Sequence, residues 1–300
     1  MTEQISLHRN LSLPLLIFYG LGNIIGAGIY VLVGKVAGVA GMYAPVSFFI
    51  ACLLALFTAF SYAELSARYP LSAGESIYLH HGFGIRFLSV GVGLLMVVGG
   101  MLSSAAILKG FVGYLSLFIV VPETIAIIVS AILLCGFAIW GIKESVRAAA
   151  LLTILELIGL LMVLWAGRQD FLELPSRIGE LIPPFQLQTW HGIFFGGLLA
   201  FYAFIGFEDM VNVAEEVKNP ERNMPLSILT ALAVATLFYM LIAILAVLTV
   251  SPALLQESEA PLVLVYQAVG GGYPKAIAAI AMFAVINGVL IQIIMASRIL

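Results

Sequence analysis

The sequence predicts an all-α integral membrane protein, from an apolar composition, a shortage of charge and a series of long apolar runs. Hydrophobic residues make up 62% of the 300 residues, charged residues make up only 10%, and the mean hydropathy is +1.13. A soluble domain has about 25% charged residues, so this chain lacks the charge needed to cover a surface that faces water. The composition therefore excludes a soluble enzyme, an extracellular disulfide-stabilised module and a disordered regulator.

The apolar residues are gathered into long runs. A helix that crosses a bilayer needs about 20 mostly apolar residues, because each residue advances about 1.5 Å through a core about 30 Å thick. Backbone groups inside lipid must be bonded within their own segment, so runs of this length predict helices, and the alternating pattern of a membrane barrel is absent. We predict about eight transmembrane helices, over residues 12–36, 43–67, 87–115, 122–142, 147–167, 191–214, 226–250 and 274–300.

The charged and metal-binding residue types exclude several functions. The net charge is −3, with 13 Lys and Arg against 16 Asp and Glu, so no basic surface is available for nucleic acid. Cys52 and Cys135 lie within apolar runs and are expected to be buried hydrophobic residues rather than metal ligands. The four histidines show no spacing of a metal site. We therefore expect no catalytic residues, no metal, no cofactor and no nucleic-acid partner, and we predict that the protein is not an enzyme.

The distribution of Lys and Arg predicts the orientation in the membrane. With the N-terminus inside, eight of the 13 Lys and Arg residues fall on the cytoplasmic side, as the positive-inside rule expects. Residues 1–11 are polar and lack the charged and then apolar segments of a cleaved signal peptide. We therefore predict a cytoplasmic N-terminus. Residues 168–190 carry prolines and acidic side chains and are predicted to form an extracytoplasmic linker. The expected location is the cell membrane, with multiple passes.

Two of the predicted helices contain glycine-rich interruptions. Residues 20–28 (GLGNIIGAG) hold four glycines and an asparagine, and residues 196–209 hold three glycines followed by Glu208 and Asp209. Each glycine weakens a helix by about 1 kcal/mol relative to alanine. One interpretation of the first segment is close helix packing through G-x-x-x-G pairs. The other is a break in the helix at the membrane midplane.

The positions of the two segments favour a transport site. If residues 12–167, with helices 1–5, form one repeat, residues 191–300, with helices 6–8, begin a second repeat that is inverted, because five is an odd number. Glycine-interrupted helices at corresponding places of inverted repeats indicate a transporter site. A broken helix exposes N–H groups that attract a carboxylate and C=O groups that attract an ammonium. Such a pair suits an amino acid zwitterion.

Three separated motifs resemble the amino acid–polyamine–organocation (APC) superfamily of permeases. They are GNIIGAGIY at residues 22–30, SYAELSARYPLSAGE at residues 61–75, and FIGFE at residues 204–208 followed by AEEVKNPERNMP at residues 214–225. The resemblance extends from about residue 12 to residue 300. It implies a LeuT-type inverted-repeat transporter fold, usually of twelve helices, with helices 1 and 6 broken at the midplane. The last four helices of such a fold would be absent from this sequence, which leaves the second repeat incomplete.

The resemblance also implies where a substrate would bind. The substrate carboxylate would contact the backbone near Ala27 and Gly28, and family members often have Ser where Ala27 stands. The amino group would contact carbonyls near Ile24 and Ile205, and Tyr202 would cap the substrate side chain. The substrate-binding residues that the resemblance implies are Ile24, Gly26, Ala27, Gly28, Ser104, Tyr202, Ile205 and Gln292.

Two acidic residues lie deep in predicted helices. Glu156 stands in the middle of the fifth run, where a charged carboxylate costs about 2.5–3.5 kcal/mol. It is either a neutral carboxyl bonded to a neighbouring helix or a proton carrier, because a buried carboxyl can exchange protons near neutral pH. Glu208 either bonds backbone N–H groups exposed at the interruption or, as the resemblance implies, takes part in substrate sensing or gating. We predict Glu156 and Glu208 as proton-coupling or gating residues.

Together these features predict secondary active transport of amino acids by alternating access, either as a proton-coupled symporter or as an antiporter. The expected partners are a small amino acid, a proton rather than sodium, and the lipid bilayer, and the protein is expected to be a monomer or a homodimer. Two alternatives stay open. One is a truncated homologue that binds or senses amino acids without transporting them, and the other is a polyamine permease.

Overall fold

The computed structural model of the protein describes residues 9–72, 74–140 and 142–299, apart from the side chains of residues 27 and 140–146. Within these ranges the structure is all-α, as predicted, with one isolated β-bridge between Leu11 and Val217. The helices are α1 (Leu13–Ala40), α2 (Ala44–Arg68), α3 (Gly74–Phe83), α4 (Arg86–Leu115), α5 (Glu123–Trp140), α6 (Ile142–Ala166), α7 (Arg168–Arg177), α8 (Leu187–Phe204), α9 (Pro220–Thr249), α10 (Pro252–Glu257), α11 (Pro261–Ala268) and α12 (Pro274–Ile299), with the short 3-10 helices η1 (Gly41–Tyr43), η2 (Ile178–Leu181) and η3 (Glu208–Glu216).

Six stretches of the described residues are long and apolar enough to cross a membrane. The longest, Leu13–Arg68, holds both α1 and α2, joined by η1, and a shorter apolar stretch, Glu123–Ile139, lies in α5. The stretch Leu187–Glu216 holds α8 and η3. The apolar helices therefore lie at the eight predicted places, as α1, α2, α4, α5, α6, α8, α9 and α12.

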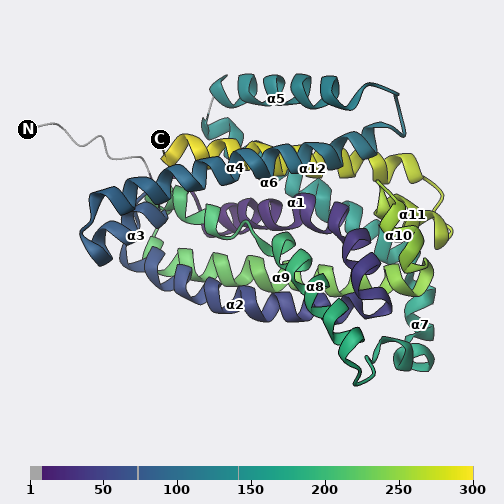
Figure 1. Ribbon diagram of the computed structural model, residues 1–300. Helices are drawn as coiled ribbons and strands as arrows, with labels where there is room; N and C mark the ends of the chain where they lie inside the picture. Colours follow the sequence, from purple (N-terminus) through teal and green to yellow (C-terminus); the bar gives the residue numbers. More distant parts are fainter. Residues whose placement is uncertain (1–8, 73, 141, 300) are drawn as a thin grey trace, which may run out of the picture.

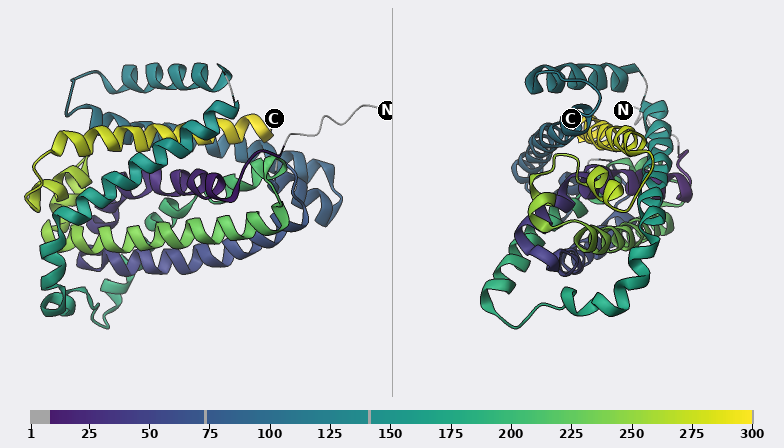
Figure 2. Two further views of the ribbon diagram at one scale, coloured as in Figure 1. Left: turned by 180° about the vertical axis from the view of Figure 1, so that it is seen from behind. Right: turned by 90° about the vertical axis from the view of Figure 1, so that its right-hand side faces the viewer.

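The long helices pack in two groups around α1. α2 and α9 run side by side and form one group with α8, while α4 and α6 pack against α12 in the other (Figure 1). α1 contacts α8 and α9 of the first group and α6 and α12 of the second. α5 lies on the outside of the bundle, where it packs against α4 and α12 (Figure 2). The consequence is a deeply buried α1, in which Ile25, Ile29 and Tyr30 are fully buried.

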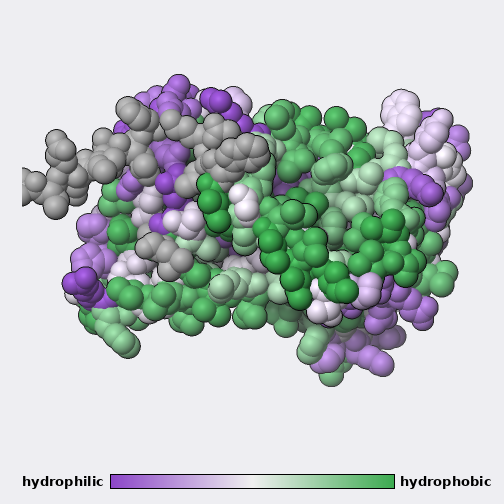
Figure 3. All heavy atoms as spheres, turned by 90° about the horizontal axis from the view of Figure 1, so that it is seen from above, coloured by the Kyte–Doolittle hydropathy of each residue, from purple (hydrophilic) through white to green (hydrophobic). Residues whose placement is uncertain are grey.

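Exposed apolar side chains cover the middle of the molecule. Figure 3 shows hydrophobic side chains gathered over the central part of one face and hydrophilic side chains toward its two ends. Leu95 of α4 and Leu133 of α5 are 68% and 67% exposed. Apolar patches of this extent are rare on a soluble monomer, and a bilayer would cover them. The surface therefore agrees with a protein that crosses the membrane several times.

The prediction that helix 1 is broken is wrong, because α1 is continuous through residues 20–28 (Figure 1). The glycines of this segment are points of close approach instead. A Cβ on Gly26 would lie 3.2 Å from the carbonyl oxygen of Ala284, and a Cβ on Gly28 would lie 2.7 Å from that of Ala203. Packing of α12 and α8 against the bare backbone offsets the weakening of about 1 kcal/mol that each glycine brings.

α8 is interrupted where the second break is predicted. The helix ends at Phe204, the backbone of Ile205 is extended, and Gly206 has a φ of +139°, a conformation that other residues rarely adopt. The chain resumes as the 3-10 helix η3 from Glu208. The end of one helix and the start of the next leave backbone groups without partners in their own helices. Helix 6 is therefore broken in this structure, whereas helix 1 is not.

Candidate functional site

The break in α8 lies against the middle of α1. Asn23 of α1 donates through Nδ2 to the carbonyl oxygen of Gly206 at 2.7 Å and to Asp209 Oδ2 at 2.6 Å. A Cβ on Gly206 would lie 2.9 Å from Asn23 Nδ2, so glycine is needed for this close approach. Gln292 of α12 donates to the same Oδ2 atom at 2.7 Å. The single carboxylate of Asp209 therefore links α1, η3 and α12.

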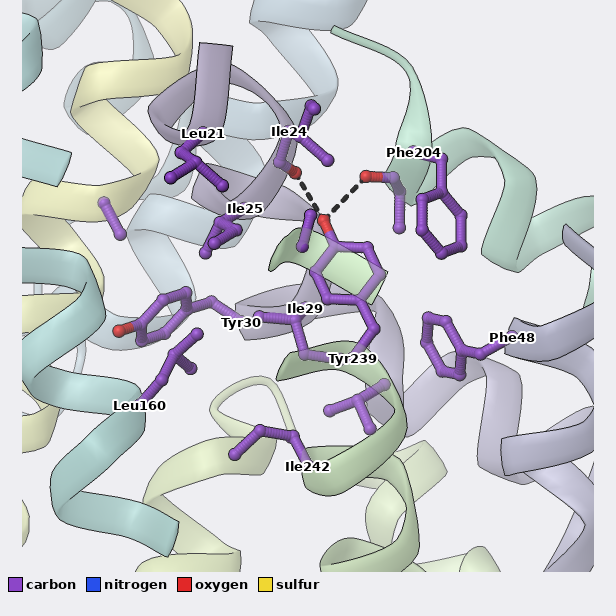
Figure 4. Close-up of a cluster of buried hydrophobic side chains, with 14 of the residues drawn as sticks. Leu21, Ile24, Ile25, Ile29, Tyr30, Phe48, Leu160, Phe204, Tyr239 and Ile242 are labelled. Carbon is purple, nitrogen blue, oxygen red and sulfur yellow. Dashed lines mark hydrogen bonds between the residues drawn. The ribbon is translucent and has the colours of Figure 1, made fainter. Parts of the chain in front are cut away.

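A buried tyrosine of α9 joins α1 and α8 from another side. Tyr239 donates its hydroxyl to the carbonyl oxygens of Ile24 and Ala203, the latter at 2.7 Å (Figure 4). Its ring packs against those of Phe48 and Phe204, with centroids 5.6 and 4.9 Å away. A hydroxyl carries one proton, so it can donate fully to only one of the two carbonyls at a time. The other carbonyl keeps the capacity to accept a hydrogen bond from a ligand.

A small cavity lies beside these carbonyls. Its volume is about 30 Å³, which suits about two water molecules and is too small for an amino acid. Its walls come from α1, α4, the end of α8 with Ile205, and α12. The lining residues are Asn23, Ile24, Gly28, Ser103, Ile107, Tyr202, Ala203, Ile205 and Gln292.

A larger cavity of about 540 Å³ lies next to the small one. Apolar side chains of α4 and α12 form most of its lining, and Glu208 and Asp209 contribute carboxylates. The hydroxyl oxygens of Ser103 and Tyr202 are 2.9 Å apart, so a hydrogen bond between α4 and α8 stands in the wall common to both cavities. The two cavities share four lining residues, which are Ser103, Tyr202, Ile205 and Gln292.

The structure brings most of the predicted binding residues together. Gly26 packs on α12 instead of lining the small cavity, and Ser103 rather than Ser104 lines it. The side chain of Ala27 lies outside the described residues, and its backbone is part of α1. The predicted residues that line the small cavity are Ile24, Gly28, Tyr202, Ile205 and Gln292.

Glu156 lies in a separate, fully buried cluster between α1, α6 and α12. Its Oε1 accepts from Asn287 Nδ2 at 2.7 Å, and the same amide lies 3.3 Å from Thr153 Oγ1. Gly22 of α1 packs directly against Thr153 and Asn287. Within the described part of the chain, Glu156 Oε2 and Asn287 Oδ1 have no hydrogen-bond partner. Both of these oxygens are acceptors in that arrangement, and the buried carboxyl has no cation among its partners in the described residues, so the surroundings favour a protonated Glu156.

Glu208 caps the break in α8. Its Oε2 accepts a hydrogen bond of 2.7 Å from the backbone N–H of Gly206, a group left without a helical partner at the interruption. This contact matches the interpretation in which the carboxylate bonds exposed backbone. Because Glu208 also lines the larger cavity, the gating interpretation remains compatible with its position and stays a prediction.

Sequence reasoning missed several residues that organise the site, namely Asn23, Tyr239 and Asn287 with its neighbour Thr153. Asn23 and Gly206 are 183 residues apart, and Tyr239 and Ile24 are 215 residues apart, so no local pattern pairs them. The available signal is a polar side chain inside an apolar run, as at residues 23 and 287. That signal marks a buried polar contact without identifying its partner.

Comparisons of the sequence with known proteins find related transporters. The family described as "Amino acid permease" matches residues 11–300. Cationic amino acid transporter 2, vacuolar, of Arabidopsis thaliana is 34% identical over 271 residues, which cover 80% of this chain and 41% of the relative. The branched-chain amino acid permease BcaP of Bacillus subtilis (strain 168) is 29% identical, over 88% of this chain and 60% of the relative. The methylthioribose transporter of the same bacterium is 28% identical, over 80% of this chain and 55% of the relative.

The chain belongs to the amino acid permease family of the APC superfamily. This membership confirms the resemblance carried by the three motifs and agrees with the apolar helices of the structure. The chain spans 41% to 43% of the length of the two plant transporters that it matches at 34% and 35% identity. The substrate, the coupling ion and the location are therefore taken up as proposals.

Proposed function

We propose that the protein carries out secondary active transport of amino acids by alternating access. The observation that carries this proposal is the break in α8, which lies against Asn23 of α1 and beside a small cavity whose lining includes polar side chains and residues with acceptor carbonyls. Two of the relatives described above are named for amino acids, one for cationic and one for branched-chain amino acids. Backbone acceptors at a broken helix recognise the ammonium group that all amino acids share.

The ammonium group of the substrate would bind the carbonyls at the break. Tyr239 can donate to only one of the Ile24 and Ala203 carbonyls at a time, which leaves an acceptor. Within the described residues no donor is bonded to the Ile205 carbonyl. The substrate carboxylate needs N–H donors, and those of α1 are engaged while the helix is continuous. We infer that α1 opens near Gly26 to Gly28 when the substrate binds.

Alternating access requires the site to enlarge on one side at a time. The small cavity of about 30 Å³ must grow before an amino acid can enter. The hydrogen bond between Ser103 and Tyr202 stands in the wall toward the larger cavity. We propose that this bond breaks when the substrate enters and that Tyr202 then covers the substrate side chain. Ser104, next to Ser103 on α4, remains a candidate contact in the enlarged site.

Proton coupling is assigned to the cluster around Glu156. Glu156 is fully buried. Its Oε1 accepts a hydrogen bond from Asn287, and its Oε2 has no hydrogen-bond partner among the described residues. The cluster adjoins Gly22, so a change of charge there acts directly on α1. We expect Glu156→Gln to abolish the pH dependence of uptake and to leave substrate binding measurable. Uptake that keeps its pH dependence in this variant would remove Glu156 from the coupling mechanism.

We propose the cell membrane as the location, with the N-terminus in the cytoplasm. The support is the excess of Lys and Arg on that side of the predicted helices. The names of the plant relatives include vacuolar and mitochondrial locations, so the membrane in question needs its own test. The orientation is determined by introducing single cysteines into residues 1–11 and 168–190 and labelling them in intact cells. A monomer or a homodimer stays the prediction for the assembly.

Counterflow in proteoliposomes tests the transport function. Vesicles containing the purified chain are loaded with one unlabelled amino acid, and the entry of the same labelled amino acid is measured. The panel covers neutral, branched-chain and cationic amino acids, methylthioribose and a polyamine. Saturable counterflow of an amino acid is the expected result. Binding without counterflow would support the alternative of an amino acid binder, and counterflow of the polyamine alone would support the polyamine permease.

A further inference from the structure

A group of buried polar atoms without partners lies where α2, α3 and η3 meet. Glu75 stands in the first turn of α3, and both of its carboxyl oxygens are buried with no hydrogen-bond partner among the described residues. The hydroxyl oxygens of Ser72 and Tyr78 are buried and unpartnered in the same sense. Tyr78 is only 9% exposed, and its hydroxyl lies 3.7 Å from the Cβ position of Gly74, next to Glu75. None of these residues lines either cavity.

η3 brings two further carboxylates toward this group. Gly74 packs directly on Val211 of η3. A 3-10 helix has three residues per turn, so Glu208 lies on the same side of η3 as Val211. A charge on Glu75 acts electrostatically on both Glu208 and Asp209. Three carboxyl groups, one on α3 and two on η3, therefore interact across the contact between these elements.

The surrounding elements supply hydroxyl groups rather than a buried cation. Tyr62 from α2 and Tyr78 from α3 face Glu75, and α4 faces α3 with the hydroxyl of Ser89, which bonds Ser76. At the other end of η3, Glu216 is paired with Arg298 of α12. Tyr69, which follows α2, is half-buried and packs on the ring of Tyr78. The other titratable groups near this junction are exposed in the structure, and they are Glu64, Arg68, His80, His81 and Arg86.

A buried carboxylate that meets hydroxyl groups but no opposite charge is unstable, and it is relieved most simply by binding a proton. Burial raises the pKa of the Glu75 carboxyl above its ordinary value. Burial also raises the pKa of Tyr78, with a further contribution from the charge of Glu75, so this hydroxyl keeps its proton. Geometry and charge thus favour a neutral Glu75 when α3 is packed on η3.

We propose that Glu75 is a second proton-binding residue of the chain and that its charge state controls the contact between α3 and η3. With Glu75 neutral, α3 packs on η3 as in this structure. With Glu75 charged, repulsion from Glu208 and Asp209 favours separation of α3 from η3. Because Glu208 and Asp209 of η3 line the larger cavity, this separation would widen that cavity. The gating role rests on the proposed transport function, whereas proton binding by Glu75 does not.

The pH dependence of thermal unfolding tests the proton site without any substrate. Since the pKa of Glu75 is raised in the folded protein, its contribution to stability is fully present at low pH and is lost as pH rises through the raised pKa. Glu75→Gln stays neutral, so the Tm of this variant should not show that loss. At pH 8 it should exceed the wild-type Tm by about 3 °C for each unit by which the pKa is raised.

Two variants serve as controls for this measurement. Glu64→Gln removes an exposed carboxylate of α2 and should follow the wild-type curve, and Glu75→Asp keeps the carboxyl group and should keep the loss of Tm with pH. Glu208→Gln removes the neighbouring charge and should reduce the loss seen in the wild type. A Glu75→Gln curve parallel to that of the wild type overturns the proposal.

A measurement with and without sodium distinguishes a proton site from a metal-cation site. The Tm of the wild type is compared at pH 8 in sodium chloride and in choline chloride, and equal values are expected. A rise that is specific to sodium and absent from Glu75→Gln would assign the site to a cation and overturn the proton assignment. If Glu75→Gln fails to fold, the Glu208→Gln curve still decides, since an unchanged loss of Tm contradicts the coupling. Failure of wild-type counterflow would reject the transport function and leave these results standing.

Discussion

α1 and α8 carry similar glycine-rich segments, yet one helix is continuous and the other is broken. Every glycine of residues 20–28 in α1 meets an atom of a neighbouring element within 4 Å of its Cβ position. Gly206, after α8, has a φ of +139°, and Glu208 bonds its N–H. Glycine alone therefore does not break a membrane helix. A break forms where a positive φ is combined with a polar side chain that satisfies the freed backbone.

The two segments also differ in the polar groups that surround them. The α8 break is held by Asn23, Asp209 and Tyr239, which bond its freed backbone or the residues beside it. In α1, Gly22 faces the cluster of Glu156 instead. The broken helix therefore offers groups for a ligand, and the continuous helix is coupled to a buried carboxyl. This division of roles can be tested by substitution at each segment.

The largest effect is expected for Gly206→Ala. Alanine would have to adopt the positive φ with its Cβ 2.9 Å from Asn23 Nδ2, and backbone strain of this kind costs about 1–3 kcal/mol. We expect loss of counterflow and a Tm lowered by several degrees. Gly91→Ala on α4, where the added Cβ has no neighbour within 4 Å, is the control and should behave as the wild type. Normal counterflow in Gly206→Ala would show that the break is dispensable.

A smaller effect is expected for Gly22→Ala in α1. The added Cβ would overlap Thr153 Oγ1 and lie 2.5 Å from Asn287 Nδ2. Overpacking of a buried contact costs about 1–3 kcal/mol, and side chains can shift to relieve part of it. We expect a lowered Tm together with an altered pH dependence of uptake, because the cluster contains Glu156. A variant with wild-type Tm would mean that α1 does not pack closely at this point, which would weaken the contrast with α8.

Tyr239→Phe should have a moderate effect that differs between stability and transport. It removes the donor shared by the Ile24 and Ala203 carbonyls, and a lost hydrogen bond costs about 0.5–1.5 kcal/mol. Tyr114→Phe is the matched control, since Tyr114 is also buried and donates to a carbonyl of α1, that of Tyr30. We expect similar losses of Tm in both variants and a loss of counterflow in Tyr239→Phe alone. Equal transport in both would separate Tyr239 from the site.

The smallest effect is expected in the segment that leads into α8. Arg177 forms hydrogen bonds of 2.9 Å with both carboxylate oxygens of Glu180, and these bonds hold the pKa of Glu180 below its ordinary value. The stabilisation from a lowered pKa is present above the ordinary pKa and is lost as pH falls through the lowered one. Glu180→Gln should therefore reduce Tm slightly at pH 7 and not in acid. An exposed ion pair contributes little, so a large drop would reveal a role in positioning α8.

Much of the fold follows from local sequence. The run lengths predict the apolar helices at the places where they occur, because the hydrophobicity of a segment is a property of that segment. The interruption after α8 was also predictable, since residues 206–209 combine glycine with two acidic residues. The pattern could not distinguish the two interpretations of residues 20–28. A glycine that breaks a helix and a glycine that packs against a neighbouring helix cannot be told apart from the sequence.

Local sequence thus predicts the membrane class, the apolar helices and the family, and the family resemblance adds five of the nine residues that line the small cavity. The tertiary structure alone decided that α1 is continuous and that Tyr239 joins it to α8. It also decided that Asp209 links three elements and that the carboxyl oxygens of Glu75 are buried beside the contact between Gly74 and Val211. The physical reason is that these features depend on pairs of groups far apart in the chain. A polar side chain in an apolar run indicates a buried hydrogen bond, but only the packing of the helices determines which partner it meets.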